Sequence, residues 1–189
     1  MSIGTFVQPM PTGKEIKLSK YDMLVSKTNV EGTITFSNSN FSKISGYKKN
    51  ELIGSSHNIV RHPDMPKAIF YLMFERLKKG KNFPSVIKNL SKNGDHYWVT
   101  TDFSIFLNKE GEIVSFTAFR EVAPKHVVKE LEPLYQKLVM LEQEDSMETS
   151  LSYLESFLNK KNMTYDEYIK DLAKPKWFGA MFFSKLFYR

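Results

Sequence analysis

The chain has 189 residues, of which 41% are hydrophobic and 14% aromatic, and its formal net charge at pH 7 is +6. This length allows one compact domain with helical additions. The chain contains no cysteine, which excludes disulfides, zinc sites with thiolate ligands and thiol nucleophiles. Because no uncharged apolar run approaches the roughly 20 residues that cross a bilayer, and no signal peptide is recognisable, we expect a cytoplasmic protein.

Basic residues predominate between residues 43 and 92, whereas acidic residues predominate between residues 127 and 173. This distribution indicates separate surfaces for separate partners, although solvated lysines account for most of the charge. The sequence has no nucleic-acid recognition motif, so we expect no nucleic-acid partner. It also lacks a recognisable set of nucleophile, base and orienting residue, and we therefore do not expect an enzyme.

The first predicted elements are an irregular arm and a β-hairpin. Residues 1–21 contain prolines and a glycine without periodicity, which is typical of an N-terminal cap or loose arm. Met23–Thr28 and Thr33–Ser37 are rich in β-forming residues, and Asn29–Gly32 between them is a turn signal. We therefore expect two antiparallel strands at the start of the main domain.

Helices follow the hairpin. A short helix is predicted within Asn38–Gly46, where asparagine provides an N-cap and glycine an end, and one further turn is predicted at Lys49–Leu52. The longest helix of this half is predicted at Lys67–Lys79, because basic residues and a glycine close its apolar pattern.

Three further strands are predicted at Pro84–Leu90, His96–Leu107 and Glu112–Glu121, and glycine-containing turns join them. The order of elements predicts an α+β fold, with a five-stranded antiparallel sheet and helices that cross one face of it. A cavity between the sheet and these helices is the expected place for a ligand.

A helical region is predicted at residues 125–173. Its apolar residues recur at spacings of three and four, as in a coiled-coil seam, with Pro133 at a position that starts or kinks a helix. Thr164 is predicted to cap the last helix. We favour packing of these stripes within the chain, and dimerisation through one of them is the next candidate.

The segment His57–Met65, HNIVRHPDM, concentrates titratable side chains just before the Lys67 helix. It contains His57, Arg61, His62 and Asp64, which is more chemistry than a simple connection needs. Histidine and arginine side chains provide donors and positive charge, so this segment is predicted to form the wall of a pocket for an anionic ligand.

Four strings, NSNFSKISGY, ELIGSSHNIVRHPDMPKAIF, KNLSKNGDHYW and ELEPLY, closely resemble the PAS domains of flavin-binding redox sensors in aerotaxis and energy-taxis receptors. The resemblance covers residues 22 to about 135. It implies a PAS sensor domain at residues 22–124 and a non-covalently bound FAD between the sheet and the helices. It also implies that the redox state of the cofactor follows the electron-transport system.

Within this resemblance, His57, Arg61 and His62 are the residues expected to bind the pyrophosphate or ribose of FAD, because a neutral apolar cleft could not hold these groups. Asp64 is expected either to orient His62 or Arg61 or to cap the following helix. Asn38 is included among the candidate binding residues, with a simple helix cap as the alternative.

Asn89 lies within a strand-like run and is expected to point into the cavity. Its carbonyl can accept from a protonated flavin nitrogen and its NH2 can donate to an unprotonated one, so flavin reduction could invert its preferred orientation. Tyr97 and Trp98 lie on opposite faces of their strand, so only one of them can face the ligand. Phe83 stands where flavin-binding relatives carry tryptophan, and it keeps the stacking capacity without the indole donor.

Two alternatives to a flavin sensor remain at this point. A haem-binding PAS domain usually takes an axial histidine from the long helix, which has none, and His62 just ahead of that helix keeps this alternative open. A PAS module without a cofactor would instead fill its cavity with side chains. A cysteinyl-flavin adduct is excluded because the chain has no cysteine.

No output domain is recognisable after the sensor, so the signal is expected to leave by protein contact. In the split form of the resembled family, the soluble PAS protein acts on a separate membrane chemoreceptor-like protein. Residues 174–189 hold six aromatic and four basic residues and no acidic residue. This tail is expected to dock on the inner face of the membrane or in a receptor groove, with packing into the chain's own core as the alternative.

Overall fold

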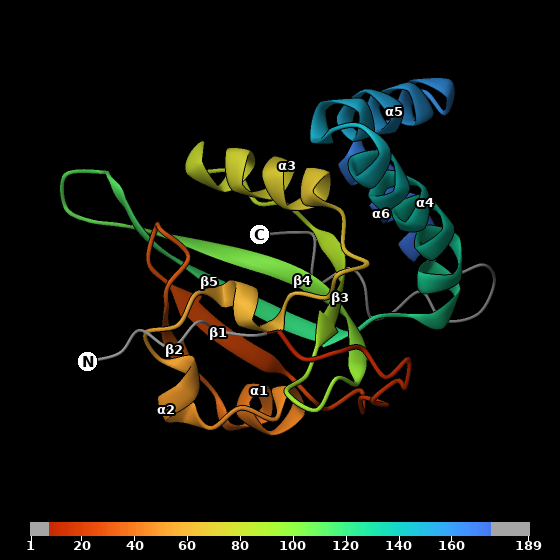
Figure 1. Cartoon of the computed structure of the whole chain (residues 1–189). Helices are drawn as coiled ribbons and strands as arrows, with labels where there is room; N and C mark the ends of the chain where they lie inside the picture. The colour runs from red at the N-terminus through yellow and green to blue at the C-terminus, as the bar shows by residue number, and fades with distance from the viewer. Residues whose placement is uncertain (1–7, 175–189) are drawn as a thin grey trace.

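The computed structural model describes residues 8–174, in which a five-stranded antiparallel sheet of order β2-β1-β5-β4-β3 forms the centre (Figure 1). The strands are β1 (Leu24–Thr28), β2 (Ile34–Ser37), β3 (Ser85–Leu90), β4 (His96–Leu107) and β5 (Ile113–Val122). The helices are α1 (Ser39–Ser45), α2 (Lys49–Leu52), the 3-10 helix η1 (His57–Val60), α3 (Lys67–Lys78), α4 (Lys125–Glu144), α5 (Met147–Lys160) and α6 (Tyr165–Ala173). The predicted α+β architecture is confirmed.

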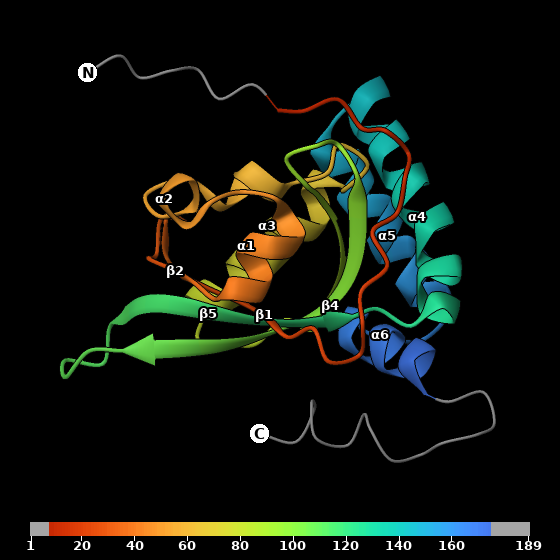
Figure 2. The same ribbon diagram turned by 90° about the horizontal axis from the view of Figure 1, so that it is seen from below.

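The helices form two groups. Helices α1–α3 lie over one face of the sheet, whereas α4–α6 stack beside its β3 edge (Figures 1 and 2). We call the face under α1–α3 the inner face. The strand register shows which side chains lie on the inner face. Asn89 of β3 pairs with Tyr97 of β4, and directly paired residues share a face. Ser26 pairs with Ala118 across β1 and β5 on this same face.

Local signals explain where the first helix begins and ends. The Asn38 Oδ1 atom accepts a hydrogen bond from the Phe41 backbone N–H at 2.9 Å, as expected of an N-cap. Gly46 adopts a φ of +73°, the left-handed conformation that glycine reaches without a steric penalty. Asn38 also bonds the backbone of β1, so this cap fixes α1 against the sheet.

Helix α4 packs on its own chain. Its buried stripe consists of Val127, Leu131, Leu134, Tyr135 and Leu138. The Tyr135 ring stacks on Trp98 with 6.3 Å between ring centroids, and its hydroxyl donates to the Val86 carbonyl at 2.9 Å. The sequence interpretation that favoured packing of the stripe within the chain therefore agrees with the structure, and α4 continues through Pro133.

The described part of the N-terminal segment runs along the β3–β4 hairpin. Thr12 donates its backbone N–H to the Gly94 carbonyl at 2.8 Å, and Ile16 donates to the His96 carbonyl at 2.7 Å. The tail at residues 175–189 lies outside the described residues. Among the helices that the structure describes, none is both long and apolar enough to cross a membrane.

Candidate functional site

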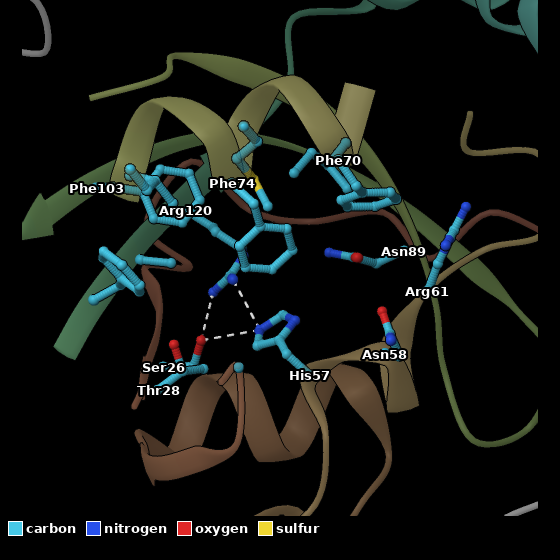
Figure 3. Close-up of a pocket in the computed structure, with 16 residues that line it drawn as sticks. Ser26, Thr28, His57, Asn58, Arg61, Phe70, Phe74, Asn89, Phe103 and Arg120 are labelled. Carbon is cyan, nitrogen blue, oxygen red and sulfur yellow. Dashed lines mark hydrogen bonds between the residues drawn. The ribbon is translucent and has the colours of Figure 1, made fainter. Parts of the chain in front are cut away.

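A cavity lies between the inner face of the sheet and the wall formed by η1 and α3 (Figure 3). Helix α3 contributes apolar side chains to it, and the sheet adds apolar residues from β3, β4 and β5. The polar residues that line it are Ser26, Thr28, His57, Asn58, Arg61, Asn89 and Arg120. The cavity therefore combines aromatic walls with a few hydrogen-bonding groups, as ligand sites do.

One end of the cavity holds a hydrogen-bonded trio. Arg120 donates from Nη1 to Ser26 Oγ at 2.9 Å, and its Nη2 lies 2.9 Å from His57 Nε2. Ser26 Oγ is also 3.1 Å from His57 Nε2. Because a guanidinium can only donate, the Nε2 atom of His57 must be the acceptor, and its ring is neutral in this arrangement.

Burial acts on both charges of this trio. Burial and the neighbouring Arg120 lower the pKa of His57 to about 3. Burial also lowers the pKa of Arg120 to about 10, so the guanidinium still carries its charge at neutral pH. No carboxylate is among the described residues that line the cavity. Arg120 is therefore a buried cation whose charge is not balanced within the pocket.

Two buried nitrogen atoms here lack a hydrogen-bond partner within the described part of the chain. They are Nδ2 of Asn89 and Nε of Arg120, and both residues are only 3% exposed. A buried donor without a partner costs free energy, so such groups call for an explanation. A bound ligand with acceptor atoms would provide one.

Arg61 lines the cavity near Asn89, and the two residues form an isolated backbone bridge. Its guanidinium donates to the Met65 carbonyl at 3.1 Å and lies 4.8 Å from the centroid of the Phe70 ring. Burial lowers the pKa of Arg61. The structure thus brings together three of the predicted residues, His57, Arg61 and Asn89, around one cavity.

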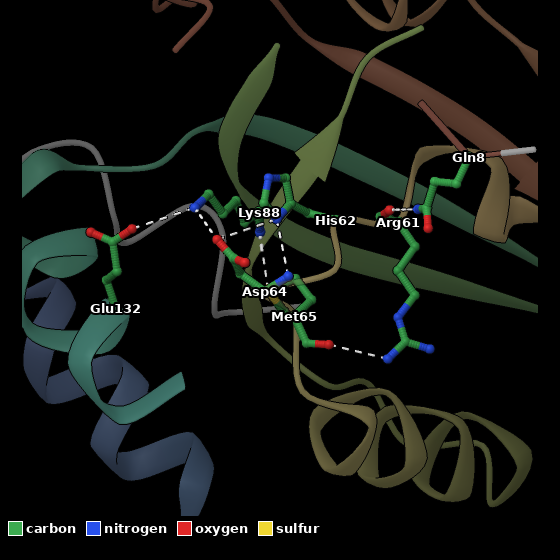
Figure 4. A network of polar contacts seen from close by, with 7 residues as sticks. All are labelled: Gln8, Arg61, His62, Asp64, Met65, Lys88 and Glu132. Carbon is green, nitrogen blue, oxygen red and sulfur yellow. Dashed lines mark hydrogen bonds and ion pairs between the residues drawn. The ribbon is translucent and has the colours of Figure 1, made fainter. Parts of the chain in front are cut away.

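His62 and Asp64 do not line this cavity, although the sequence assigned them to the cofactor. The carboxylate of Asp64 accepts from Lys88 Nζ at 2.7 Å, and Lys88 Nζ lies 3.5 Å from Glu132 of α4 (Figure 4). The Nδ1 atom of His62 accepts from the Asp64 backbone N–H at 3.1 Å. The contact that orients His62 thus comes from the backbone of Asp64, while the Asp64 carboxylate bonds Lys88 outside the pocket.

The His62 ring packs edge-on against His96, with 5.8 Å between ring centroids. Burial lowers the pKa of His62 to about 4, with the nearby Lys88 as a second cause. Neighbouring residues of an extended segment point in opposite directions, so Arg61 can reach the cavity only if His62 turns away from it. This geometry separates the two basic residues that the sequence had grouped.

The predicted choice between Tyr97 and Trp98 is resolved by strand register. Trp98 stacks on Tyr135 of α4, so it faces away from α1–α3. Tyr97 is fully buried on the inner face, and its hydroxyl has no described partner. Tyr97 is nevertheless not among the residues that line the cavity.

Phe83 and Asn38 also lie outside the cavity. The Phe83 ring stacks on Tyr165 of α6, with centroids 4.7 Å apart and planes 5° from parallel. The polar atoms of Asn38 are engaged by backbone groups of β1 and α1. The alternative role for Asn38, a helix cap, explains the bond to Phe41, and the other two bonds fix α1 beside β1.

The sequence interpretation did not identify Arg120 or Ser26 as pocket residues. A signal for Arg120 was present, because Phe116, Ala118 and Arg120 alternate along one strand and a charged residue ends this apolar row. The contact of Ser26 with His57 and Arg120 joins segments far apart in the chain, so no local pattern specifies it.

Comparisons with known proteins agree that the chain contains a PAS fold. A family model described as the PAS fold matches residues 34–120. The aerotaxis receptor of Escherichia coli is 41% identical over 130 residues, which cover 69% of this chain and 26% of the receptor. The biofilm dispersion protein BdlA of Pseudomonas aeruginosa is 24% identical over 119 residues, which cover 59% of this chain and 28% of that protein. The chain thus spans about a quarter of the length of these relatives.

Solved structures share the fold. The PAS domain of a Colwellia psychrerythraea protein superimposes with a TM-score of 0.50 at 18% identity, covering 55% of this chain and 87% of that domain. An RNA-binding light-oxygen-voltage receptor superimposes with a TM-score of 0.51 at 17% identity, covering 65% of this chain and 33% of that receptor. At these identities the likeness concerns the fold alone.

Proposed function

This chain contains a PAS domain of the type found in the aerotaxis receptor, and we propose that the domain binds FAD and senses redox state in energy taxis. Its relatives are named as an aerotaxis receptor, a nitrogen fixation regulatory protein and a biofilm dispersion protein, and none of these names is that of an enzyme. The observation that carries the proposal is the cavity with unpaired donors on Asn89 and Arg120 between aromatic walls.

These donors suit a flat heteroaromatic ring that carries oxygen and nitrogen acceptors. When bound, a flavin supplies reversible uptake of electrons, and reduction changes the charge and protonation of its ring. The amide of Asn89 can offer either a donor or an acceptor. Arg120 can only donate and therefore favours negative charge beside it. Arg61, which also lines the cavity, is the residue that we assign to the anionic part of FAD.

We assign the output to contact with a membrane chemoreceptor-like protein, with the chain located in the cytoplasm or at the inner membrane face. The relatives named as an aerotaxis receptor and a biofilm dispersion protein support a signalling partner of this kind. The candidate docking segments are the helical region at residues 125–173 and the tail at residues 174–189. Formation of a homodimer remains part of the same proposal.

The structure weakens the haem alternative. Its candidate axial ligand, His62, packs against His96 and does not line the cavity. His57 does line the cavity, but its Nε2 atom already accepts from Arg120. A cofactor-free interaction module is therefore the main competitor, because its cavity would need no ligand.

The visible spectrum of the purified chain tests the proposal. We expect a yellow protein whose flavin absorption disappears on reduction with dithionite. Substitution Arg120→Met should lower the flavin content, because it removes the buried donor beside the ring. Lys27→Met is the matched control, since Lys27 alternates with Ser26 on β1 and its ammonium lies over the Phe106 ring.

A colourless chain that fails to take up added FAD would contradict the flavin proposal and favour the cofactor-free module. Equal flavin content in the Arg120 and Lys27 variants would contradict the role assigned to Arg120. A Soret band in place of flavin absorption would identify a haem protein instead.

A further inference from the structure

Helix α3 forms one wall of the cavity, and this single helix supplies four of its lining residues. Phe70, Met73, Phe74 and Leu77 all face the pocket from α3. Any shift of this helix therefore changes the shape of the cavity. The contacts that hold α3 in place therefore help to determine the shape of the cavity.

The beginning of α3 is held by a residue from α4. Pro66 occupies the N-cap position and makes no side-chain cap hydrogen bond. Instead, the Glu142 carboxylate accepts from the backbone N–H groups of Lys67 and Ala68, each at 2.8 Å. A carboxylate at this position satisfies free N–H groups and interacts favourably with the helix dipole. The cap of α3 is thus supplied by a distant segment of the chain.

The other end of α3 is held by α6. Arg76 donates from its two terminal nitrogens to the two carboxylate oxygens of Asp166, at 2.6 and 2.8 Å. The Arg76 guanidinium also lies 5.5 Å from the centroid of the Phe83 ring, which stacks on Tyr165. Two-point pairing of this kind fixes orientation as well as distance.

A buried hydrogen-bond chain ties the same helices to the sheet. The Tyr165 and Tyr135 hydroxyls are 3.1 Å apart, and Tyr135 donates to the Val86 carbonyl of β3 at 2.9 Å. Helices α4 and α6 therefore contact both ends of α3 while they are anchored on β3. We call the contacts of Glu142 and Asp166 with α3 the α3 clamp.

We propose that α4–α6 form the output unit of the pocket and are coupled to its ligand through the α3 clamp. This inference rests on the proposed flavin function and names the element that regulates, and is regulated by, the same site. With the clamp closed, α3 is held against the sheet and the cavity keeps its shape. Because coupling between two sites is reciprocal, a ligand that prefers this shape also favours docking of α4–α6.

This coupling provides a route for a signal from the flavin to the partner. A change in flavin redox state that alters its contacts with the cavity changes the position that α3 prefers, and so changes the docking of α4–α6. The surface that these helices offer to a partner then changes. The pocket and the partner surface need not touch for this transfer to occur.

A charge-swap experiment tests the coupling. The variants are Arg76→Asp, Asp166→Arg and the double variant, which restores the pair with reversed polarity. We measure amide hydrogen exchange in α6 and the affinity for added FAD. Each single variant should lose protection in α6 and bind FAD at least about fivefold more weakly, the lower end of typical coupling energies. The double variant should recover a large part of both properties.

The control uses an exposed ion pair on the same helix. Glu75 Oε2 of α3 and Nζ of Lys79, the C-cap residue of the helix, lie 3.5 Å apart, and this pair involves no C-terminal helix. Lys79→Glu and Glu75→Lys should leave both α6 protection and FAD affinity unchanged. Exchange in β4 and β5 reports whether each variant is folded, and Glu142→Gln gives a milder perturbation of the other end of the clamp.

The results separate two kinds of failure. If the native chain binds FAD and the single variants lose α6 protection at unchanged FAD affinity, the coupling is refuted while the flavin function stands. If the native chain binds no FAD, the flavin function fails and the coupling falls with it. Equal α6 protection in the oxidised and the reduced protein would also overturn the assignment of α4–α6 as the output unit.

Discussion

The inner face of the sheet carries polar atoms whose hydrogen-bonding capacity is not used within the described chain. Nδ2 of Asn89, the hydroxyl of Tyr97 and Nε of Arg120 are all buried without a partner. Each costs free energy in the folded protein. Asn89 and Arg120 line the cavity, whereas Tyr97 does not, and this difference allows a ligand role to be separated from simple packing.

Asn89→Leu should therefore have opposite effects on stability and on binding. The change keeps the side-chain volume nearly constant and removes a buried amide nitrogen without a described partner, so the ligand-free protein should gain about 1 kcal/mol of unfolding free energy. Flavin affinity should fall by about tenfold or more, which corresponds to one lost hydrogen bond with its desolvation cost. Urea denaturation of the ligand-free protein and a FAD titration measure the two quantities.

Tyr97→Phe is the matched control for Asn89→Leu. It removes another unpaired polar group from the same face, so it should also stabilise the ligand-free chain while leaving flavin affinity unchanged. If both variants bind flavin as the native chain does, Asn89 has no role in the cofactor site.

The neutral state of His57 predicts a pH dependence of stability. Its pKa is about 3 in the folded chain, against an ordinary value of 6.5. The unfolded chain therefore binds the proton more readily, and stability is complete above pH 6.5 and falls as the pH decreases toward 3. For one such histidine, the loss between pH 6.5 and 5 is roughly 1.5 kcal/mol.

His57→Gln should flatten this part of the profile, because glutamine keeps an amide near the position of Nε2 and does not titrate. Unfolding free energies between pH 7.5 and 5 provide the measurement. His126→Gln, at an exposed position of α4, is the control for replacing a histidine outside the pocket. An unchanged slope for the His57 variant would show that this ring does not contribute.

Sequence patterns identified part of the candidate site and missed the rest for a physical reason. His57, Arg61 and Asn89 were predicted and lie around one cavity. Arg120 was missed although it continues the alternating row of β5, because its hydrogen bonds with Ser26 and His57 join segments far apart in the chain. His62 was grouped with Arg61 by adjacency, although neighbouring side chains in extended segments diverge.

At the scale of elements, strands and helix caps were predictable because their causes are local. The hairpin turns, the Asn38 cap and the Thr164 cap appear where the sequence places them. The sequence left open whether Pro133 starts a helix or lies within one, and in the structure α4 passes through it, because packing of the apolar stripe outweighs one lost backbone bond. The capping of α3 by Glu142 was also unpredictable, because Glu142 lies 75 positions from Lys67, whose N–H it accepts.

The contact between the N-terminal segment and the β3–β4 hairpin depends on Gly94. Its φ is +87°, and a Cβ atom added there would lie 2.1 Å from the Met10 carbonyl oxygen. Gly94→Ala should therefore displace the segment and break the hydrogen bond from Thr12 to Gly94. Backbone strain accounts for roughly 1–2 kcal/mol of lost stability, and the clash adds to it.

Gly111→Ala is the control that measures the cost of backbone strain without a clash. Gly111 has a similar φ of +84°, and an added Cβ meets nothing within 4 Å. Chemical denaturation should show a larger loss for the Gly94 variant, with faster hydrogen exchange at Thr12 and Ile16. Equal losses and unchanged exchange would mean that the segment adapts to the added methyl group.

At the scale of the whole molecule, part of the uneven charge distribution is used inside the chain. The basic first half meets the acidic C-terminal helices through Arg76 with Asp166 and through Lys88 with Glu132. The sequence interpretation assigned the two charge blocks to separate partners. In the structure, some of these charges are partners of each other, and they join the pocket domain to α4–α6.

The tail at residues 174–189 is predicted to be needed for docking and not for flavin binding. The residues that line the cavity lie between Ser26 and Arg120, so deletion after Ala173 should leave flavin content unchanged. The same deletion should abolish association with membranes or receptor. Each basic residue near an anionic surface contributes about 1 kcal/mol, and the deleted segment carries four such residues with six aromatics.

Co-sedimentation distinguishes a membrane surface from a receptor groove as the docking site of the tail. Binding to vesicles of anionic lipid alone would indicate a membrane surface, whereas binding only to membranes that contain the receptor would indicate a protein groove. Replacing the tail's four basic residues by glutamine should weaken the first more than the second, because lipid attraction is electrostatic and screened by salt. Unchanged co-sedimentation of the truncated chain would refute a docking role, and loss of flavin on truncation would place the tail in the chain's own core.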